Sequence, residues 1–129
     1  GFAYNDSKLA NALFALELAE RLKTQDNHPL VVAAHPGITQ TDLARHSTIG
    51  AVITKLLAQT VHMGALPTLR AATEQAASPG DFFGPGGLLE MRGSPVEVKF
   101  SQRAHDKDKA KALWAASEQM TGLTLSNSA

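Results

Sequence analysis

The run of five apolar residues from 30 to 34 constrains the fold more than any other part of the sequence. It reads Leu-Val-Val-Ala-Ala without interruption, and Pro29 and Pro36 lie close to its two ends. A short apolar run between turn residues is typical of a strand that is buried on both faces. The two prolines make a segment of buried helix the less favoured reading. The sequence therefore predicts a strand in a sheet that helices cover on both sides.

Helices are predicted before and after this strand. Leucines and alanines recur at helical spacing over residues 4–24, with charged residues between them. Three further helices are predicted over 49–60, 62–77 and 105–121. The last of these helices has a suitable residue at each end, Asp106 as N-cap and Gly122 as C-cap.

The connections between these elements complete the predicted order of helix, strand, helices, strand and helix. Residues 76–87 are rich in Gly and Pro and are expected to form a loop, 88–91 a short strand, and 94–102 an irregular connection. This alternation predicts an α/β fold with a parallel sheet. Two strands are too few for such a sheet, so we expect the remainder to come from a partner chain or from residues outside this sequence.

The composition limits the classes of partner and of site. Of 129 residues, 43% are hydrophobic and 19% are charged, as in one soluble globular domain. Twelve basic residues balance twelve acidic ones, which indicates neither nucleic-acid binding nor an anionic membrane surface. There is no cysteine, and the five histidines lack metal-ligand spacing, so no metal site is expected. No apolar run is long enough to span a bilayer, and the first residues do not form a signal peptide. We therefore expect a cytoplasmic protein. We also expect that this chain has been cut from a longer one.

Tyr4 and Lys8 are the candidate catalytic residues. They are four residues apart at the start of a predicted helix, so their side chains share one face. A lysine ammonium beside a tyrosine hydroxyl stabilises the phenolate, which lets tyrosine exchange a proton with an alcohol or carbonyl oxygen. The lysine also has donors for the ribose hydroxyls of a dinucleotide. By itself such a pair is more often an ordinary solvated helix face.

Three motifs carry a resemblance to a known family. The sequence Tyr-Asn-Asp-Ser-Lys-Leu-Ala-Asn over 4–11 resembles the active-site segment of short-chain dehydrogenases/reductases, in the branch of retinol dehydrogenases and protochlorophyllide reductases. His-Pro-Gly-Ile-Thr-Gln-Thr-Asp-Leu over 35–43 is similar to the Pro-Gly-x-x-x-Thr segment after that family's next strand. Residues 112–123 resemble its final helix. The resemblance implies that residues 1–129 are the C-terminal part of a single Rossmann-like domain with a doubly wound parallel sheet.

The resemblance implies roles residue by residue. Tyr4 is the expected general acid/base, and Lys8 the residue that activates it and binds the nicotinamide ribose. The expected cofactor contacts, besides Tyr4 and Lys8, lie in one loop at the carboxyl end of the strand, where α/β sheets bind ligands: Pro36, Gly37, Ile38, Thr39 and Thr41. Outside this context Pro36 and Gly37 read as a plain turn, and Thr41 as a helix cap. The expected cofactor is NAD(P)(H), with NADP(H) favoured by the resemblance.

Several parts of the family pattern do not occur between residues 1 and 129. The glycine-rich Thr-Gly-x-x-x-Gly-x-Gly turn, the Asn-Ala-Gly stretch and the catalytic serine all precede the tyrosine in the family order. We therefore expect an NAD(P)-dependent carbonyl reductase or alcohol dehydrogenase of which these residues alone are inactive. The apolar segment 49–61 lies at the position of the family's substrate lid and favours a small hydrophobic carbonyl or alcohol substrate; the alternative is that these residues are ordinary core. The alternative is a non-catalytic fragment or assembly module that keeps the fold and pairs with another copy or with the N-terminal half.

Overall fold

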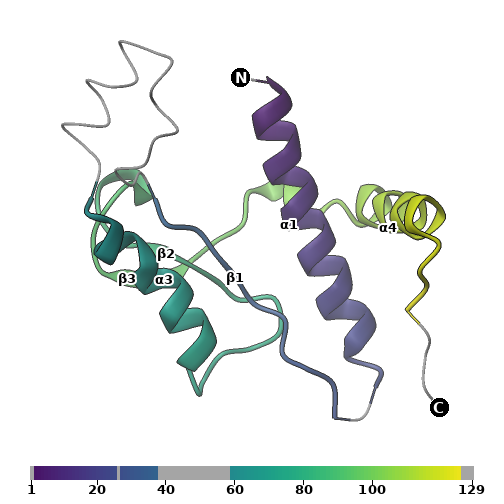
Figure 1. Cartoon of the computed structure of the whole chain (residues 1–129), viewed down its shortest axis with the longest axis horizontal. Coiled ribbons are helices and arrows are strands. Elements are labelled where there is room, and N and C mark those ends of the chain that lie inside the picture. Colours follow the sequence, from purple (N-terminus) through teal and green to yellow (C-terminus); the bar gives the residue numbers. More distant parts are fainter. Residues whose placement is uncertain (1, 26, 38–58, 126–129) are drawn as a thin grey trace. The chain divides into compact units, whose positions relative to one another are not determined.

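The computed structural model describes residues 2–25, 27–37 and 59–125 (Figure 1). They belong to two compact units, which are treated separately below. The helical unit consists of Gly1–Val32, Ser78–Gly80 and Phe100–Ala129, and the sheet unit of Ala33–Ala77 and Asp81–Lys99. In the described part of the chain, no helix combines the length and the apolar character that crossing a membrane requires.

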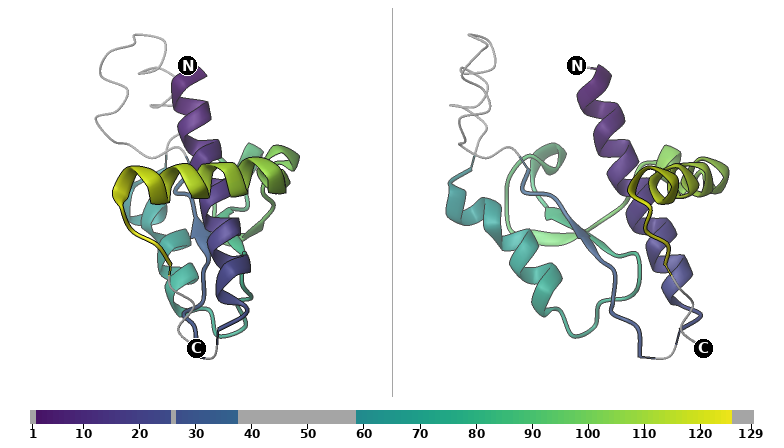
Figure 2. Two further views of the ribbon diagram at one scale, coloured as in Figure 1. Left: turned by 90° about the vertical axis from the view of Figure 1, so that its right-hand side faces the viewer. Right: turned by 45° about the vertical axis from the view of Figure 1, so that its right-hand side comes forward.

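The helical unit is built from two α-helices and a short 3-10 helix. Helix α1 (Phe2–Leu22) confirms the helix predicted over 4–24, η3 covers Gln102–His105, and α4 covers Lys107–Thr121. Figure 2 shows α4 crossing α1. The core of the unit is formed by small and branched apolar side chains together with one tryptophan: Leu13, Ala19, Leu22, Ala104, Ala110 and Trp114.

Trp114 is the largest side chain in this crossing. Its ring stacks on Phe14 with 5.0 Å between ring centroids and 19° between the planes. On α1, the guanidinium carbon of Arg21 lies 4.6 Å from the Trp114 ring, and the Arg21 Nε donates to Glu17 at 2.8 Å. The Arg21 guanidinium therefore lies against the Trp114 ring, and the Glu17 carboxylate one helical turn away neutralises its charge.

The ends of α4 confirm the predicted caps. The Asp106 side chain accepts from the Lys109 amide at 3.1 Å, which satisfies one of the free N–H groups of the first turn. Gly122 follows the helix with a φ of 69° and donates its amide to Glu118. This left-handed conformation is the usual reason for glycine after a helix.

The sheet unit places one helix against a three-stranded sheet. Strand β1 is Ala33–Ala34, α3 is Val61–Thr73, β2 is Phe82–Pro85, η2 is Leu88–Glu90 and β3 is Pro95–Val98. The strand order is β1-β2-β3, with β1 and β2 parallel and β2 and β3 antiparallel. Helix α3 contacts all three strands. The most deeply buried side chains of the unit are Phe83, Pro67 and Pro85.

The α/β fold class is confirmed, whereas three expectations about the strands are wrong. The segment 76–87 is not all loop, because it contains β2. Residues 88–91 are not a strand, because η2 occupies 88–90 and Leu89 and Glu90 have left-handed φ values of 51° and 56°. The connection 94–102 contains β3, which returns from β2 as a hairpin and makes the sheet mixed rather than wholly parallel.

The remaining boundaries differ by smaller amounts. Only Ala33 and Ala34 of the strand predicted over 30–34 pair with β2. Helix α3 begins one residue before the predicted 62–77 and ends at Thr73, where Glu74 has an extended ψ of 108°. Most of the helix predicted over 49–60 lies outside the described residues, and its last two positions precede α3 without being helical.

Candidate active site

Tyr4 and Lys8 lie in the first two turns of α1, and their side chains meet. The Lys8 Nζ lies over the Tyr4 ring, 5.4 Å from the ring centroid. Tyr4 is 57% exposed and Lys8 is exposed as well, so both polar groups are accessible to a ligand. The backbone carbonyl of Tyr4 accepts from the Ser7 hydroxyl at 2.7 Å. The face shared by the two candidate catalytic residues is therefore present, with the cation on the aromatic ring.

The Pro36–Gly37 turn follows the carboxyl end of β1 in the sheet unit. Gly37 has a φ of 65°, a left-handed conformation in which a side chain is strained. A Cβ atom at this position would lie 2.7 Å from the Cγ of Pro85 and 2.5 Å from the carbonyl oxygen of Met91. The turn therefore requires glycine both for its backbone conformation and for the close approach of the 85–94 connection.

Two side chains hold the backbone of this turn. The Gly37 amide donates to the His35 Nδ1 at 3.3 Å, and the Gln59 Nε2 donates to the Pro36 carbonyl at 2.8 Å. Since the His35 Nδ1 accepts, a neutral His35 ring carries its proton on Nε2, which lies 3.4 Å from a carboxylate oxygen of Glu90. The Gly37 amide and the Pro36 carbonyl therefore already have partners within the protein.

The other predicted site residues cannot be placed in the same way. Ile38, Thr39 and Thr41 lie outside the described residues. Tyr4 and Lys8 belong to the helical unit, and Pro36 and Gly37 to the sheet unit. Each half of the candidate site is thus defined by its own local geometry.

Three residues around the turn were missed by the sequence analysis: His35, Gln59 and Glu90. His35 adjoins the Pro-Gly motif and could have been found by its position. Gln59 lies 23 residues beyond Pro36, and no local pattern predicts that its carboxamide returns to the turn. Glu90 reaches His35 because η2 adopts left-handed backbone conformations at 89 and 90, which nothing in the sequence signals.

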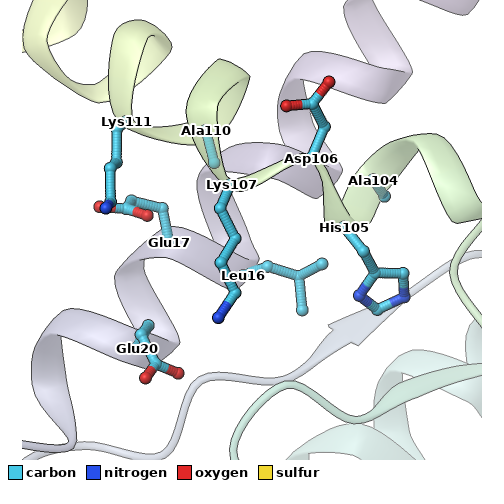
Figure 3. Close-up of a pocket in the computed structure, with 9 residues that line it drawn as sticks. All are labelled: Leu16, Glu17, Glu20, Ala104, His105, Asp106, Lys107, Ala110 and Lys111. Atoms are coloured by element: carbon cyan, nitrogen blue, oxygen red, sulfur yellow. The ribbon is translucent and has the colours of Figure 1, made fainter.

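A separate pocket of about 360 Å³ lies in the helical unit, where α1 meets η3 and the start of α4 (Figure 3). Its polar lining mixes both charges, with carboxylates at 17, 20 and 106 and ammonium groups at 107 and 111. Each of these carboxylates is paired with a basic residue three or four positions further along the chain. The lining on α1 begins at Leu16, eight residues or about 12 Å along the helix from Lys8. This pocket is distinct from the candidate catalytic pair.

The chain is similar to known proteins along nearly its whole length. No protein-family model matches the sequence. The chain is similar to human retinol dehydrogenase 12, with 34% identity over 128 residues that cover 95% of this chain and 37% of that protein. Human retinol dehydrogenase 13 is 35% identical over 133 residues, covering 94% and 37%. A crystal structure of an uncharacterized protein from Mycobacterium Paratuberculosis has 38% identity and a TM-score of 0.70, covering 96% of this chain and 40% of that one.

The likeness therefore runs along nearly the whole sequence, although the chain spans only 37% of the length of these retinol dehydrogenases. The helix that carries Tyr4 and Lys8, the Pro-Gly turn after a parallel strand and the last helix occur in one α/β chain. Over about 95% of its length the chain matches retinol dehydrogenases of the short-chain dehydrogenase/reductase family, consistent with a C-terminal part of such a protein.

Proposed function

We propose that residues 1–129 carry the acid/base pair and the nicotinamide-side turn of an NAD(P)-dependent oxidoreductase that interconverts a carbonyl and an alcohol. The observation that carries this proposal is the exposed contact between Tyr4 and Lys8 on one face of α1. An exposed tyrosine whose ring carries a lysine ammonium has groups suited to general acid/base chemistry. The match to that family supports the same assignment.

The residues present fit one side of a nicotinamide dinucleotide. The exposed Lys8 ammonium offers donors to ribose hydroxyls. The Pro36–Gly37 turn lies at the carboxyl end of a parallel strand, the position at which α/β sheets bind ligands. Residues 1–129 contain no glycine-rich turn of the kind that holds the pyrophosphate, so this fit covers the nicotinamide end alone.

The chain's own residues perform the proton transfer in this proposal. The bound cofactor supplies or accepts the hydride. In carbonyl reduction the Tyr4 hydroxyl donates its proton to the carbonyl oxygen, and in alcohol oxidation the same oxygen takes the hydroxyl proton back. The Lys8 ammonium stabilises the negative charge that Tyr4 bears after it has given up its proton.

We further propose a small hydrophobic alcohol or aldehyde as the substrate. The similar human proteins are retinol dehydrogenases by name, and retinol is such an alcohol. The apolar sequence of 49–61 supports this substrate class, because the family resemblance implies a substrate lid at this position and an apolar lid favours an apolar ligand. NADP(H) is the cofactor that the family resemblance favours.

The test is cofactor-dependent turnover by the full-length natural polypeptide. The purified protein is incubated with NADPH or NADH and aliphatic, aromatic and retinoid aldehydes, and oxidation of the cofactor is followed by its absorbance. We expect oxidation that requires the aldehyde. If the folded protein oxidises neither cofactor with any aldehyde of the panel, the proposal is wrong and the non-catalytic alternative replaces it.

The same assay on residues 1–129 alone tests how much of the site they contain. Because no pyrophosphate-binding turn occurs among them, we expect no turnover and no rise in Tm on adding NADPH. Robust turnover by this segment would contradict that expectation.

A further inference from the structure

Gln59 carries a buried carboxamide that uses both of its polar atoms. The residue is 8% exposed and directly precedes Thr60, the N-cap of α3. Its Nε2 donates to the Pro36 carbonyl at 2.8 Å, and its Oε1 accepts from the Gly93 amide at 3.0 Å. A buried amide with a partner at each end is held in one orientation, and losing either bond would leave a buried polar group unsatisfied.

The two partners of Gln59 belong to segments that already touch each other. Pro36 precedes Gly37, whose Cα packs against the backbone of Met91. Gly93 lies two residues beyond Met91, in the same connection between η2 and β3. Gln59 therefore links the Pro36–Gly37 turn to the connection between η2 and β3, against which the turn packs.

We propose that Gln59 is a positioning residue for the nicotinamide cofactor. It would act through Pro36 and Gly37, keeping the turn in its binding conformation before the cofactor arrives. This inference rests on the proposed function of the turn. Without the two bonds the turn populates other conformations. The apparent affinity for the cofactor then falls in proportion to the fraction of molecules that remain in the binding conformation. Proton transfer by Tyr4 in the saturated enzyme does not depend on that fraction.

Two substitutions of Gln59 separate its bonds. Gln59→Met keeps an unbranched side chain of similar size and removes both hydrogen-bonding ends. Gln59→Glu retains an acceptor for the Gly93 amide but turns a carboxylate oxygen toward the Pro36 carbonyl. In the full-length natural polypeptide we expect Gln59→Glu, which loses one bond, to raise the KM for NADPH by about tenfold, and Gln59→Met, which loses both, to raise it at least as much. The kcat at saturating NADPH should change by less than about threefold.

Thr60→Ala is the matched control for a merely structural effect. Thr60 is the adjacent residue, and its hydroxyl accepts from the Met63 amide at the start of α3. Its loss weakens the helix without touching Pro36 or Gly93. We expect a lower Tm for Thr60→Ala with the KM for NADPH unchanged. The inference is overturned if folded Gln59 variants bind NADPH as the wild type does, or if Thr60→Ala raises the KM equally.

If neither Gln59 variant folds, a measurement on the wild type tests the positioning role of Gln59. Hydrogen exchange of the Gly93 amide should slow when NADPH is added, because the cofactor would favour the conformation in which this bond is made. Unchanged exchange with bound NADPH would contradict the inference alone. A wild-type protein that binds neither NADPH nor NADH would instead overturn the proposed function, and this inference with it.

Discussion

The Cα of Gly37 lies so close to the backbone of Met91 that a Cβ atom would come within 2.5 Å of the Met91 carbonyl oxygen. The turn after β1 and the connection between η2 and β3 are therefore fitted to each other at a position where only a hydrogen can be accommodated. Gly122 provides a natural comparison, because its φ of 69° nearly equals the 65° of Gly37 while, among the described residues, no atom beyond its chain neighbours lies within 4 Å of its Cβ position.

We expect Gly37→Ala to lower the free energy of unfolding by about 2–5 kcal/mol, since left-handed strain and steric overlap act together. Gly122→Ala should cost about 1–2 kcal/mol, because only the strain applies. Urea unfolding of the two variants measures both effects. Equal losses at the two positions would show that the contact with Met91 contributes nothing.

Trp114 anchors the crossing of α1 and α4. It is 6% exposed and contacts Phe14 and Arg21. Trp114→Ala should lower the free energy of unfolding by about 3–5 kcal/mol, as usual for removing a buried aromatic side chain. Met120 lies on the same helix and is 87% exposed, so Met120→Ala should change stability by less than about 0.5 kcal/mol. Similar losses for the two variants would contradict this packing.

Acid should weaken the start of α4. The Lys109 ammonium, which donates to Asp106 at 2.7 Å, and the backbone N–H of Lys109 hold the pKa of Asp106 below its ordinary value of 3.8. Since the pKa is lower in the folded state, the carboxylate stabilises the fold above that ordinary value, and this contribution is lost as the pH falls through the lowered pKa.

Asp106→Asn isolates this charge, because asparagine is also a good N-cap. We expect the variant to be less stable than the wild type near neutral pH, with a smaller difference at an acidic pH well below 3.8, where the Asp106 carboxylate becomes protonated. Unfolding of both proteins at the two pH values measures this, and Lys109→Gln should remove most of the same pH dependence. A difference that is the same at both pH values would rule out the carboxylate as its cause.

The helices were predictable from the sequence because their signals are local. The apolar spacing of α1 and the caps Asp106 and Gly122 lie within each helix or at its ends. Strands β2 and β3 were not predicted, because the residues that accommodate their glycine and prolines lie far away in the sequence. Gly84 in β2 looks like a turn residue, yet the His35 ring occupies the space of its missing Cβ. Pro85 pairs with Pro95 at the end of the ladder, where neither needs an N–H group.

The candidate site likewise has one part that the local sequence predicts and one part that it does not. Tyr4 and Lys8 could be found because four-residue spacing on a helix guarantees that they meet. The Pro-Gly turn could be found from its motif, but the groups that hold its backbone could not. His35 and Gln59 act through the folded chain, and in Gln59 the bond spans 23 residues.

The most direct test of the central claim is the effect of Tyr4→Phe on turnover by the full-length natural polypeptide with NADPH and an aldehyde. Tyr4 is 57% exposed and only its hydroxyl is removed, so the fold should be unaffected. Asp6→Asn is the control, because Asp6 is exposed on the same helix and residues two apart do not share a face. We predict that Tyr4→Phe lowers kcat by about 10²- to 10⁴-fold while Asp6→Asn retains wild-type activity. A folded Tyr4→Phe protein that turns over as fast as the wild type would contradict the assignment of Tyr4 as the acid/base.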